Sequence, residues 1–115
     1  MKNAQELIDA IKDVPEERFN QNVYFHIYET GCGCVMHHFE VHKFGKLVQS
    51  SEIAYHGYFD LQPTESSYIF GKRSIINRIG FQMNWPTYEE FTVQAAIERI
   101  KFIDNLNKER NEKVD

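Results

Sequence analysis

The chain has 115 residues, of which 42% are hydrophobic and 26% are charged, and its formal net charge is -4. A chain of this length forms one domain that buries roughly 65% of its unfolded surface, so it can build a core without a metal or a disulfide. No apolar run approaches the length of a membrane-spanning helix, and the acidic balance argues against binding to nucleic-acid phosphates. We therefore expect no membrane association and no nucleic-acid partner.

The N-terminal residues and the two cysteines indicate a reducing compartment. Residues 1–6 are polar and helix-like, without the apolar segment that directs secretion. Cys32 and Cys34 are separated by one residue, and a disulfide between them would close a ring too short for relaxed geometry. We therefore expect free thiols and a cytoplasmic location.

The first predicted element is a helix over residues 4–13. Asn3 suits its N-cap, and Glu6 follows three residues later, as in a capping box. Apolar residues recur at helical spacing at Leu7, Ile8, Ile11 and Val14. Pro15 then ends the helix and favours one further short helical turn that ends near Phe19.

The next part of the chain mixes strand and helix signals. Residues 23–28 are dense in β-branched and aromatic side chains, which predicts a strand. Residues 35–50 fit two patterns. One helical face would hold Val35, Met36, Phe39 and Leu47, whereas a strand would alternate at Val35, Phe39 and Val41. We interpret this segment as a helix, with a hairpin partner for the strand as the alternative.

Residues 61–71 predict a short helix with signals at both ends. Pro63 suits the first helical position and Glu65 falls at the third. Gly71 offers a C-terminal stop.

The last helix has the strongest pattern. Thr87 and Glu90 follow Pro86 as a capping-box pair. Two apolar stripes come next, one at Val93, Ala96, Ile97, Ile100 and Ile103 and the other at Phe91, Ala95, Phe102 and Leu106. We expect this helix to be central to the core and the polar residues after 107 to fray.

Together these elements predict a mainly α, small single-domain fold. The compact domain would span residues 1–107, and residues 108–115 would form a polar C-terminal tail. A short β-strand or hairpin before residue 48 would make the fold α+β instead.

A cluster of cysteines and histidines occupies residues 31–42. If a helix begins near Cys34, then His38 and His42 follow on the same stripe, where they could bind zinc with Cys32 as a fourth ligand. The chain has no second cysteine pair, so a small buried Cys34 and partly exposed histidines are the preferred interpretation. A Cys34 nucleophile with His37 or His38 as base is a further possibility, without an identifiable third group.

Two other stretches could form a binding surface. Lys72, Arg73 and Arg78 form the basic cluster of the chain, which could meet a phosphate or an acidic partner. The cluster lacks the glycine pattern of a phosphate-binding loop, so a solvated loop is the preferred interpretation. Three cations are too few for strong binding to duplex nucleic acid. Aromatic residues are plentiful, and Tyr55, Tyr58 and Phe59 could supply anchors at a protein interface.

Four short motifs occur in order along the chain: PEERFN at 15–20, CGCV at 32–35, YFDLQPTESSYIFG at 58–71 and WPT at 85–87. In this order they resemble a family of small proteins found in tailed phages and bacterial genomes. The resemblance implies a compact, mostly helical domain of viral or mobile-element context with no assigned reaction. The chain departs from the family pattern at His37, where a second family cysteine would fall.

These observations predict a non-enzymatic accessory protein of phage type that needs no cofactor and leave its oligomeric state open. It would bind a host or defence-system macromolecule, most readily a protein, in the host cytoplasm if a phage encodes it. The alternative is a metal- or small-ligand-binding domain centred on Cys32, Cys34, His38 and His42.

Overall fold

A computed structural model describes residues 1–20, 34–48 and 52–114, with side chains described for these residues except 52–54 and 110–114. In these ranges the chain is helical, which confirms the mainly α, single-domain prediction. The elements are α1 (Ala4–Ile11), the 3-10 helix η1 (Glu16–Arg18), α2 (Val35–Phe44), α3 (Glu52–Phe59), α4 (Pro63–Phe70), α5 (Arg73–Met83) and α6 (Val93–Val114). The strand predicted at 23–28 lies outside the described residues.

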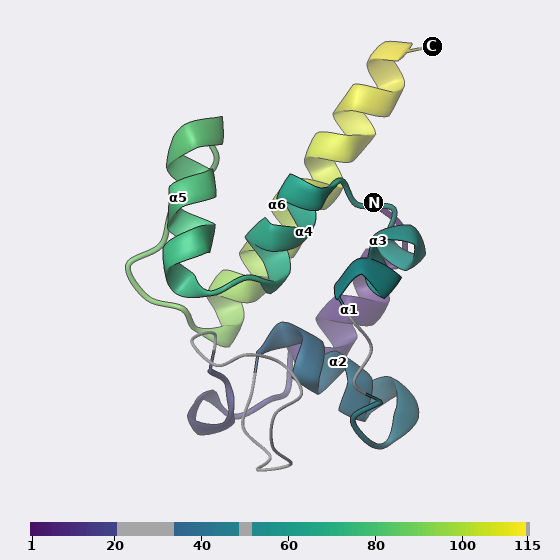
Figure 1. Cartoon of the computed structure of the whole chain (residues 1–115), viewed down its shortest axis with the longest axis vertical. Coiled ribbons are helices and arrows are strands. Elements are labelled where there is room, and N and C mark those ends of the chain that lie inside the picture. The colour runs from purple at the N-terminus through teal and green to yellow at the C-terminus, as the bar shows by residue number, and fades with distance from the viewer. Residues whose placement is uncertain (21–33, 49–51, 115) are drawn as a thin grey trace.

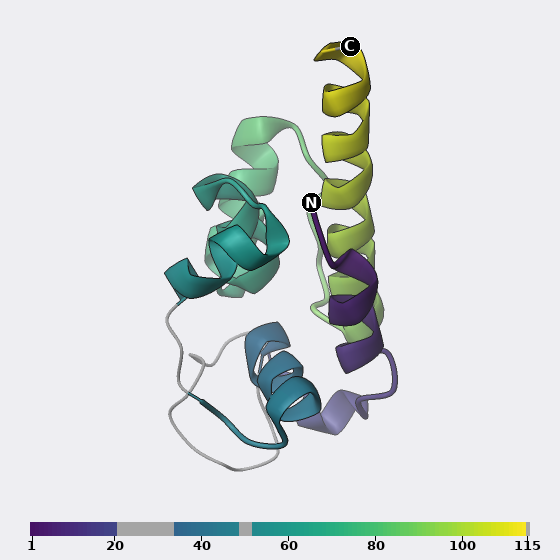
Figure 2. The same cartoon turned by 90° about the vertical axis from the view of Figure 1, so that its right-hand side faces the viewer.

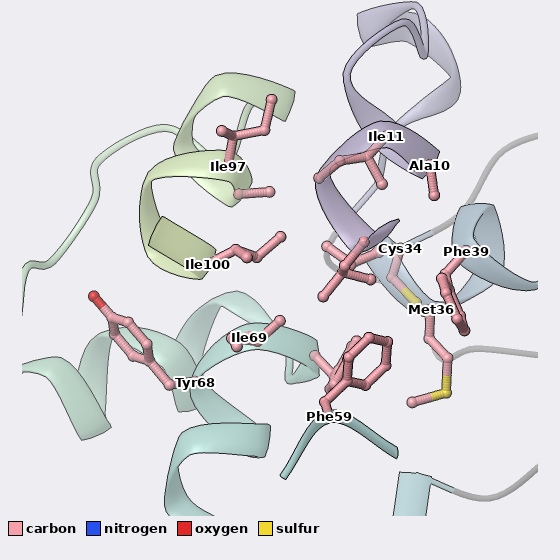
Figure 3. Close-up of a cluster of buried hydrophobic side chains, with 14 of the residues drawn as sticks. Ala10, Ile11, Cys34, Met36, Phe39, Phe59, Tyr68, Ile69, Ile97 and Ile100 are labelled. Carbon is pink, nitrogen blue, oxygen red and sulfur yellow. The ribbon is translucent and has the colours of Figure 1, made fainter. Parts of the chain in front are cut away.

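The long helix α6 organises the packing. Helices α1 and α4 both pack against α6, while α2 packs on α1 and α4, and α5 packs on α4 (Figures 1 and 2). Five helices contribute fully buried side chains that point toward a shared interior (Figure 3): Ile11, Phe39, Phe59, Ile69 and Ile100. The core therefore joins segments from both ends of the chain.

The capping box predicted for α1 does not form. Asn3 adopts a left-handed conformation with φ of 60°, and its side chain makes no cap hydrogen bond. Its Nδ2 donates instead to the backbone oxygen of Tyr58 at 3.0 Å. Glu6 is also used across the fold, since its carboxylate accepts hydrogen bonds from Lys43 and Tyr58. Both side chains therefore bond to residues of other helices instead of capping α1.

Helix α2 confirms the helical interpretation of residues 35–44, and the hairpin alternative is wrong for this segment. Gly45 ends the helix with φ of 74°, a left-handed conformation that glycine adopts easily. Leu47 therefore lies beyond the helix. The buried Glu40 carboxylate accepts hydrogen bonds from the backbone nitrogen of Val48, at 2.9 Å, and from the Tyr55 hydroxyl.

Helix α4 begins and ends as predicted. Pro63 is its first residue, and the Glu65 carboxylate accepts a hydrogen bond from the backbone nitrogen of Gln62 at 2.8 Å. A Cβ at Gly71 would lie 2.4 Å from the backbone oxygen of Ser67, so a residue without a side chain is needed where this helix ends.

Residues 73–78 are helical, which corrects the predicted solvated loop. They form the first turns of α5, whose Ile76 is fully buried. Packing of α5 on α4 favours the helix over the loop. Asn84 ends α5 with φ of 59°.

Helix α6 begins at Val93, later than the Thr87 capping-box pair predicted. Thr92 is the residue that caps it, because its Oγ1 accepts a hydrogen bond from the backbone nitrogen of Ala95 at 3.1 Å. The Glu16 carboxylate accepts another from the backbone nitrogen of Val93 at 3.1 Å. The helix continues to Val114, and the domain boundary at 107 stays a prediction.

The segment between α5 and α6 packs against the core through Trp85. Its ring centroid lies 5.1 Å from that of Tyr68 on α4 and 5.9 Å from that of Phe102 on α6. Among the described helices, none combines the length and apolar character that crossing a membrane requires.

Replacement by alanine should change the free energy of unfolding in opposite directions at two glycines inside helices. A Cβ at Gly80 in α5 would lie 2.9 Å from the backbone oxygen of Pro86, so Gly80→Ala should lower the free energy of unfolding by about 1–3 kcal/mol. No described atom lies within 4 Å of a Cβ at Gly57 in α3, so Gly57→Ala should raise it by about 0.5–1 kcal/mol. Urea denaturation of both variants checks the pair, and equal effects would contradict the packing at Gly80.

Candidate functional site

The aromatic residues predicted to form a surface lie largely in the interior. Tyr55 is 7% exposed and Phe59 is fully buried, so neither can act as a surface anchor in this fold. Phe59 packs edge-on against Phe39, with ring centroids 5.2 Å apart. The polar residues around 55–59 suggested an exposed stretch. In the structure this stretch belongs to helix α3, which packs on α4, and this packing buries Tyr55 and Phe59.

Tyr58 is half-buried and belongs to a polar link between helices. Lys43 Nζ donates to the Tyr58 hydroxyl at 2.9 Å and to Glu6 Oε1 at 2.7 Å, and the Tyr58 hydroxyl donates to Glu6. The hydrogen bonds from Lys43 and Tyr58 lower the pKa of Glu6. This link joins α1, α2 and α3 and leaves Tyr58 with a structural role.

The described members of the proposed zinc site do not converge. Cys34 precedes α2 and is 2% exposed, His38 is 8% exposed, and His42 is exposed. The Nε2 of His38 lies 2.7 Å from the backbone oxygen of Arg18. Cys32 lies outside the described residues, and within those that are described no three cysteine, histidine or acidic side chains are placed to hold a metal ion.

A cleft of about 520 Å³ lies between α1, η1 and α2. Its charged and histidine lining comes from two distant parts of the chain and comprises Asp9, Asp13, Arg18, His37, His38, His42 and Lys46. His37 is 4% exposed, and its ring centroid lies 4.9 Å from that of His38. Burial, together with the neighbouring His38, lowers the pKa of His37. The cleft therefore keeps a neutral imidazole beside groups of both charges.

The three predicted basic residues lie at the start of α5. Lys72 precedes the helix, Arg73 is its first residue, and Arg78 is exposed on it. Arg73 donates from Nη2 to the backbone oxygen of Glu89 at 3.2 Å, and its guanidinium carbon lies 5.0 Å from the centroid of the Phe91 ring. Arg73 and Arg78 thus lie on one helix rather than in a loop, and Lys72 is the residue just before it.

The same helix carries an exposed aromatic residue that was not predicted from the sequence. Phe81 is 84% exposed, the highest value among the exposed large hydrophobic residues of the described chain. At 3.6 residues per turn, Ser74, Arg78 and Phe81 follow one stripe, on the side of α5 away from the buried Ile76. The helical period of residues 73–83 could have revealed this stripe once the segment was read as a helix.

The charge around this stripe is uniformly positive in the sequence. Residues 66–88 hold Lys72, Arg73 and Arg78 and no aspartate or glutamate, so all 17 acidic residues lie elsewhere. Helix α5 is thus the basic element of an acidic protein.

A buried arginine lies beside the segment that joins α5 to α6. Arg99 on α6 is fully buried, and its Nε donates to the backbone oxygen of Tyr68 at 3.2 Å. Neither Nη1 nor Nη2 has a hydrogen-bond partner among the described residues. The guanidinium carbon lies 5.6 Å from the Tyr88 ring centroid and 5.5 Å from that of Phe91.

The environment of Arg99 does not compensate its charge. Burial lowers the pKa of Arg99 to about 10, so the guanidinium remains charged at neutral pH. Burial also raises the pKa of Tyr68 and of Tyr88, which keeps both phenols neutral. Contact with aromatic rings contributes about 2 kcal/mol for a desolvated cation. A buried charge that lacks its partner costs about 3–5 kcal/mol, so the rings alone do not offset the burial.

A second cleft has a volume of about 660 Å³, and two of its lining rings also contact Arg99, which itself does not line the cleft. It is lined by Arg73, Ser74, Asn77, Thr87, Tyr88, Glu89 and Phe91. Asn77 holds Tyr88 in place at the edge of this cleft. The Asn77 side chain donates to the backbone oxygen of Tyr88 at 2.8 Å and accepts from the backbone nitrogen of Tyr88 at 3.0 Å. Tyr88 and Phe91 thus contact the buried guanidinium and also line the cleft.

Comparison of the chain with protein-family models, with curated proteins and with solved structures found no significant match. The motif resemblance to phage and bacterial proteins therefore stays a prediction.

The low pKa of His37 predicts a pH dependence of stability. As the pH falls through 6.5, the unfolded chain binds a proton at this residue more readily than the folded state does, so the free energy of unfolding should fall. One such group contributes at most about 1.4 kcal/mol per pH unit. His37→Gln should reduce the slope in urea denaturation, whereas the matched change at the exposed His42, His42→Gln, should keep it. An unchanged slope in His37→Gln would contradict this assignment.

Proposed function

We propose that the protein is a non-enzymatic binding domain that docks on an acidic protein surface through the outer stripe of α5. The stripe consists of Ser74, Arg78 and Phe81, with Lys72 and Arg73 beside it. The observation that carries this proposal is the 84% exposure of Phe81 on a basic helix.

An exposed phenylalanine on a well-packed helix favours an intermolecular role. Aromatic residues and arginines are enriched among the residues that dominate binding energy, because they combine a large contact area with specific polar geometry. Phe81 would enter an apolar pocket of the partner, and Arg78 would meet acidic groups at its rim. Phe81 is no part of the hydrophobic core, so the stability of the fold does not require an aromatic ring at this position.

The charge distribution supports an acidic partner. The stretch of residues 66–88 is free of acidic side chains, whereas the chain as a whole is negatively charged. Complementary charge speeds association and fixes the orientation of the partner more than it adds affinity. Three cations remain too few for strong binding to duplex nucleic acid, so a protein is the preferred partner.

The motif resemblance adds a biological context to the proposal. If the chain belongs to a phage or a mobile element, the acidic partner would be a host or defence-system protein in the host cytoplasm. The proposed docking on α5 does not depend on this context.

Small-ligand binding in the cleft between α1 and α2 is the second candidate function. Its volume of about 520 Å³ lies in the range of ligand sites, and it combines histidines with both charges. For the metal version centred on Cys32, Cys34, His38 and His42, zinc should be present at one equivalent in untagged protein. The zinc should be lost in a His38→Ala, His42→Ala double variant.

Substitutions on α5 test the docking proposal. Phe81→Ser and Arg78→Glu should each reduce the proteins captured from a native host extract at least tenfold, as measured by quantitative mass spectrometry. The matched controls are Phe44→Ser on α2 and Lys101→Glu on α6, since both positions are exposed and lie on other helices. Captured proteins should also dissociate more readily at high salt, because the charge attraction is screened.

Folding can be separated from binding in the same variants. Changes at exposed positions usually alter stability by less than about 0.5 kcal/mol, so Phe81→Ser and Arg78→Glu should unfold at the wild-type urea concentration. Capture that is equal in wild type and both α5 variants would contradict the proposed surface. Capture of nucleic acid, or of a second copy of the chain, would contradict the proposed partner.

A further inference from the structure

Arg99 has no place in the docking proposed for α5, although Arg73 and Ser74 border both the docking stripe and the cleft near Arg99. The guanidinium is fully buried, and within the described residues neither Nη1 nor Nη2 donates a hydrogen bond. Buried polar groups in folded proteins are almost always hydrogen-bonded, so these two nitrogens need an explanation. An arginine keeps its charge and its planar fork of donors, which match the oxygens of an oxyanion.

The second arginine of this region lies at the cleft itself. Arg73 lines the cleft and is exposed, and both its guanidinium and that of Arg99 lie against the ring of Phe91, at 5.0 and 5.5 Å from the centroid. Arg73 uses one nitrogen for the backbone oxygen of Glu89. Phe91 is therefore the ring that the exposed and the buried cation share.

We propose that the cleft between α5 and the 85–91 segment binds the phosphate group of a small molecule, with Arg73 and Arg99 as its two cationic donors. Arg73 would meet the phosphate at the cleft, and Arg99 would reach it from behind the rings of Tyr88 and Phe91 after a side-chain rearrangement. Asn77 is a positioning residue, because both of its amide atoms are bonded to the backbone of Tyr88.

A phosphate fits this site better than a neutral ligand does. A dianion compensates both cations, and its oxygens can accept hydrogen bonds from Nη1 and Nη2 of Arg99, which have no partner among the described residues. The remaining charge on the cleft wall is that of Glu89, an exposed carboxylate that opposes an anion. Glu89 also offers an alternative within the protein, since its carboxylate could pair with Arg99 in place of the phosphate.

Inorganic phosphate is the probe for the test, with sodium chloride at equal ionic strength as the reference. Phosphate at ten times its dissociation constant should lower the unfolding constant of the wild type about 11-fold, by mass action. The side-chain Nε–Hε resonance of Arg99 should shift as phosphate is added. Failure of both signals in the wild type would overturn the proposal.

Variants assign the effect to the two arginines. Arg73→Met, at an exposed position that leaves the core intact, should weaken phosphate binding at least threefold. Arg99→Lys keeps the charge but loses the fork, and it should weaken binding at least tenfold. Lys101→Met removes an exposed cation from the same helix as Arg99 and should leave phosphate binding unchanged. Equal loss in Lys101→Met and Arg73→Met would show only a general charge effect and would overturn the proposal.

The Glu89→Gln variant distinguishes phosphate binding from an ion pair between Glu89 and Arg99. Its result does not depend on whether the core accepts a substitution at the buried Arg99. Removal of a like charge should tighten phosphate binding severalfold. If Glu89 is instead the partner of Arg99, this variant should unfold more easily without phosphate and bind phosphate no more tightly, which would overturn the proposal. Neither result bears on Phe81, so this site and the docking surface can fail independently.

Discussion

The burial of one face of α6 between α1 and α4 is the constraint on which the rest of the structure depends. Helices α1 and α4 have eight residues each, and isolated helices shorter than about 12–15 residues are marginal in water. Packing on α6, whose Ile97, Ile100 and Ile103 are buried, therefore supports both helices, together with α2 for α1 and α5 for α4. The N-terminal helix is thus held by residues far along the chain, which makes the core a product of contacts between distant parts of the sequence.

Local signals predicted the helices that carry their own boundaries, and they failed where distant contacts decide. Helix α4 was predictable because Pro63, Glu65 and Gly71 act within the helix itself. The capping role expected of Asn3 was lost because its side chain bonds α3 instead. The basic residues from Lys72 to Arg78 were expected in a loop, but residues 73–78 are helical because α5, with its buried Ile76, packs on α4.

The candidate sites were less predictable than the fold. A spacing of four residues placed Cys34, His38 and His42 on one stripe, but it could not show that two of them are buried and one is exposed. The aromatic residues near 55–59 looked like surface anchors because burial is set by the helices that cover them. Arg99 was missed for the same reason, since the lack of an acceptor among the described residues is a property of the folded chain. Phe81 was missed because residues 73–83 were not interpreted as a helix.

Two buried charges show how differently the fold treats such groups. Glu40 is fully buried, and its carboxylate accepts hydrogen bonds from Val48 and Tyr55, so its burial also joins α2 to the residues that follow it and to α3. Arg99 is equally buried but donates only from Nε within the described chain. The first group has the partners expected of a structural charge. The second lacks that full set of partners among the described residues.

The single tryptophan of the chain lies at the junction between these regions. Trp85 packs between Tyr68 of α4 and Phe102 of α6, and the segment that contains it runs on to Tyr88 and Phe91 beside Arg99. Its intrinsic fluorescence therefore reports one defined interface rather than an average over the molecule. Separation of α4 from α6, or movement of the segment beside Arg99, can be followed optically in the unlabelled protein.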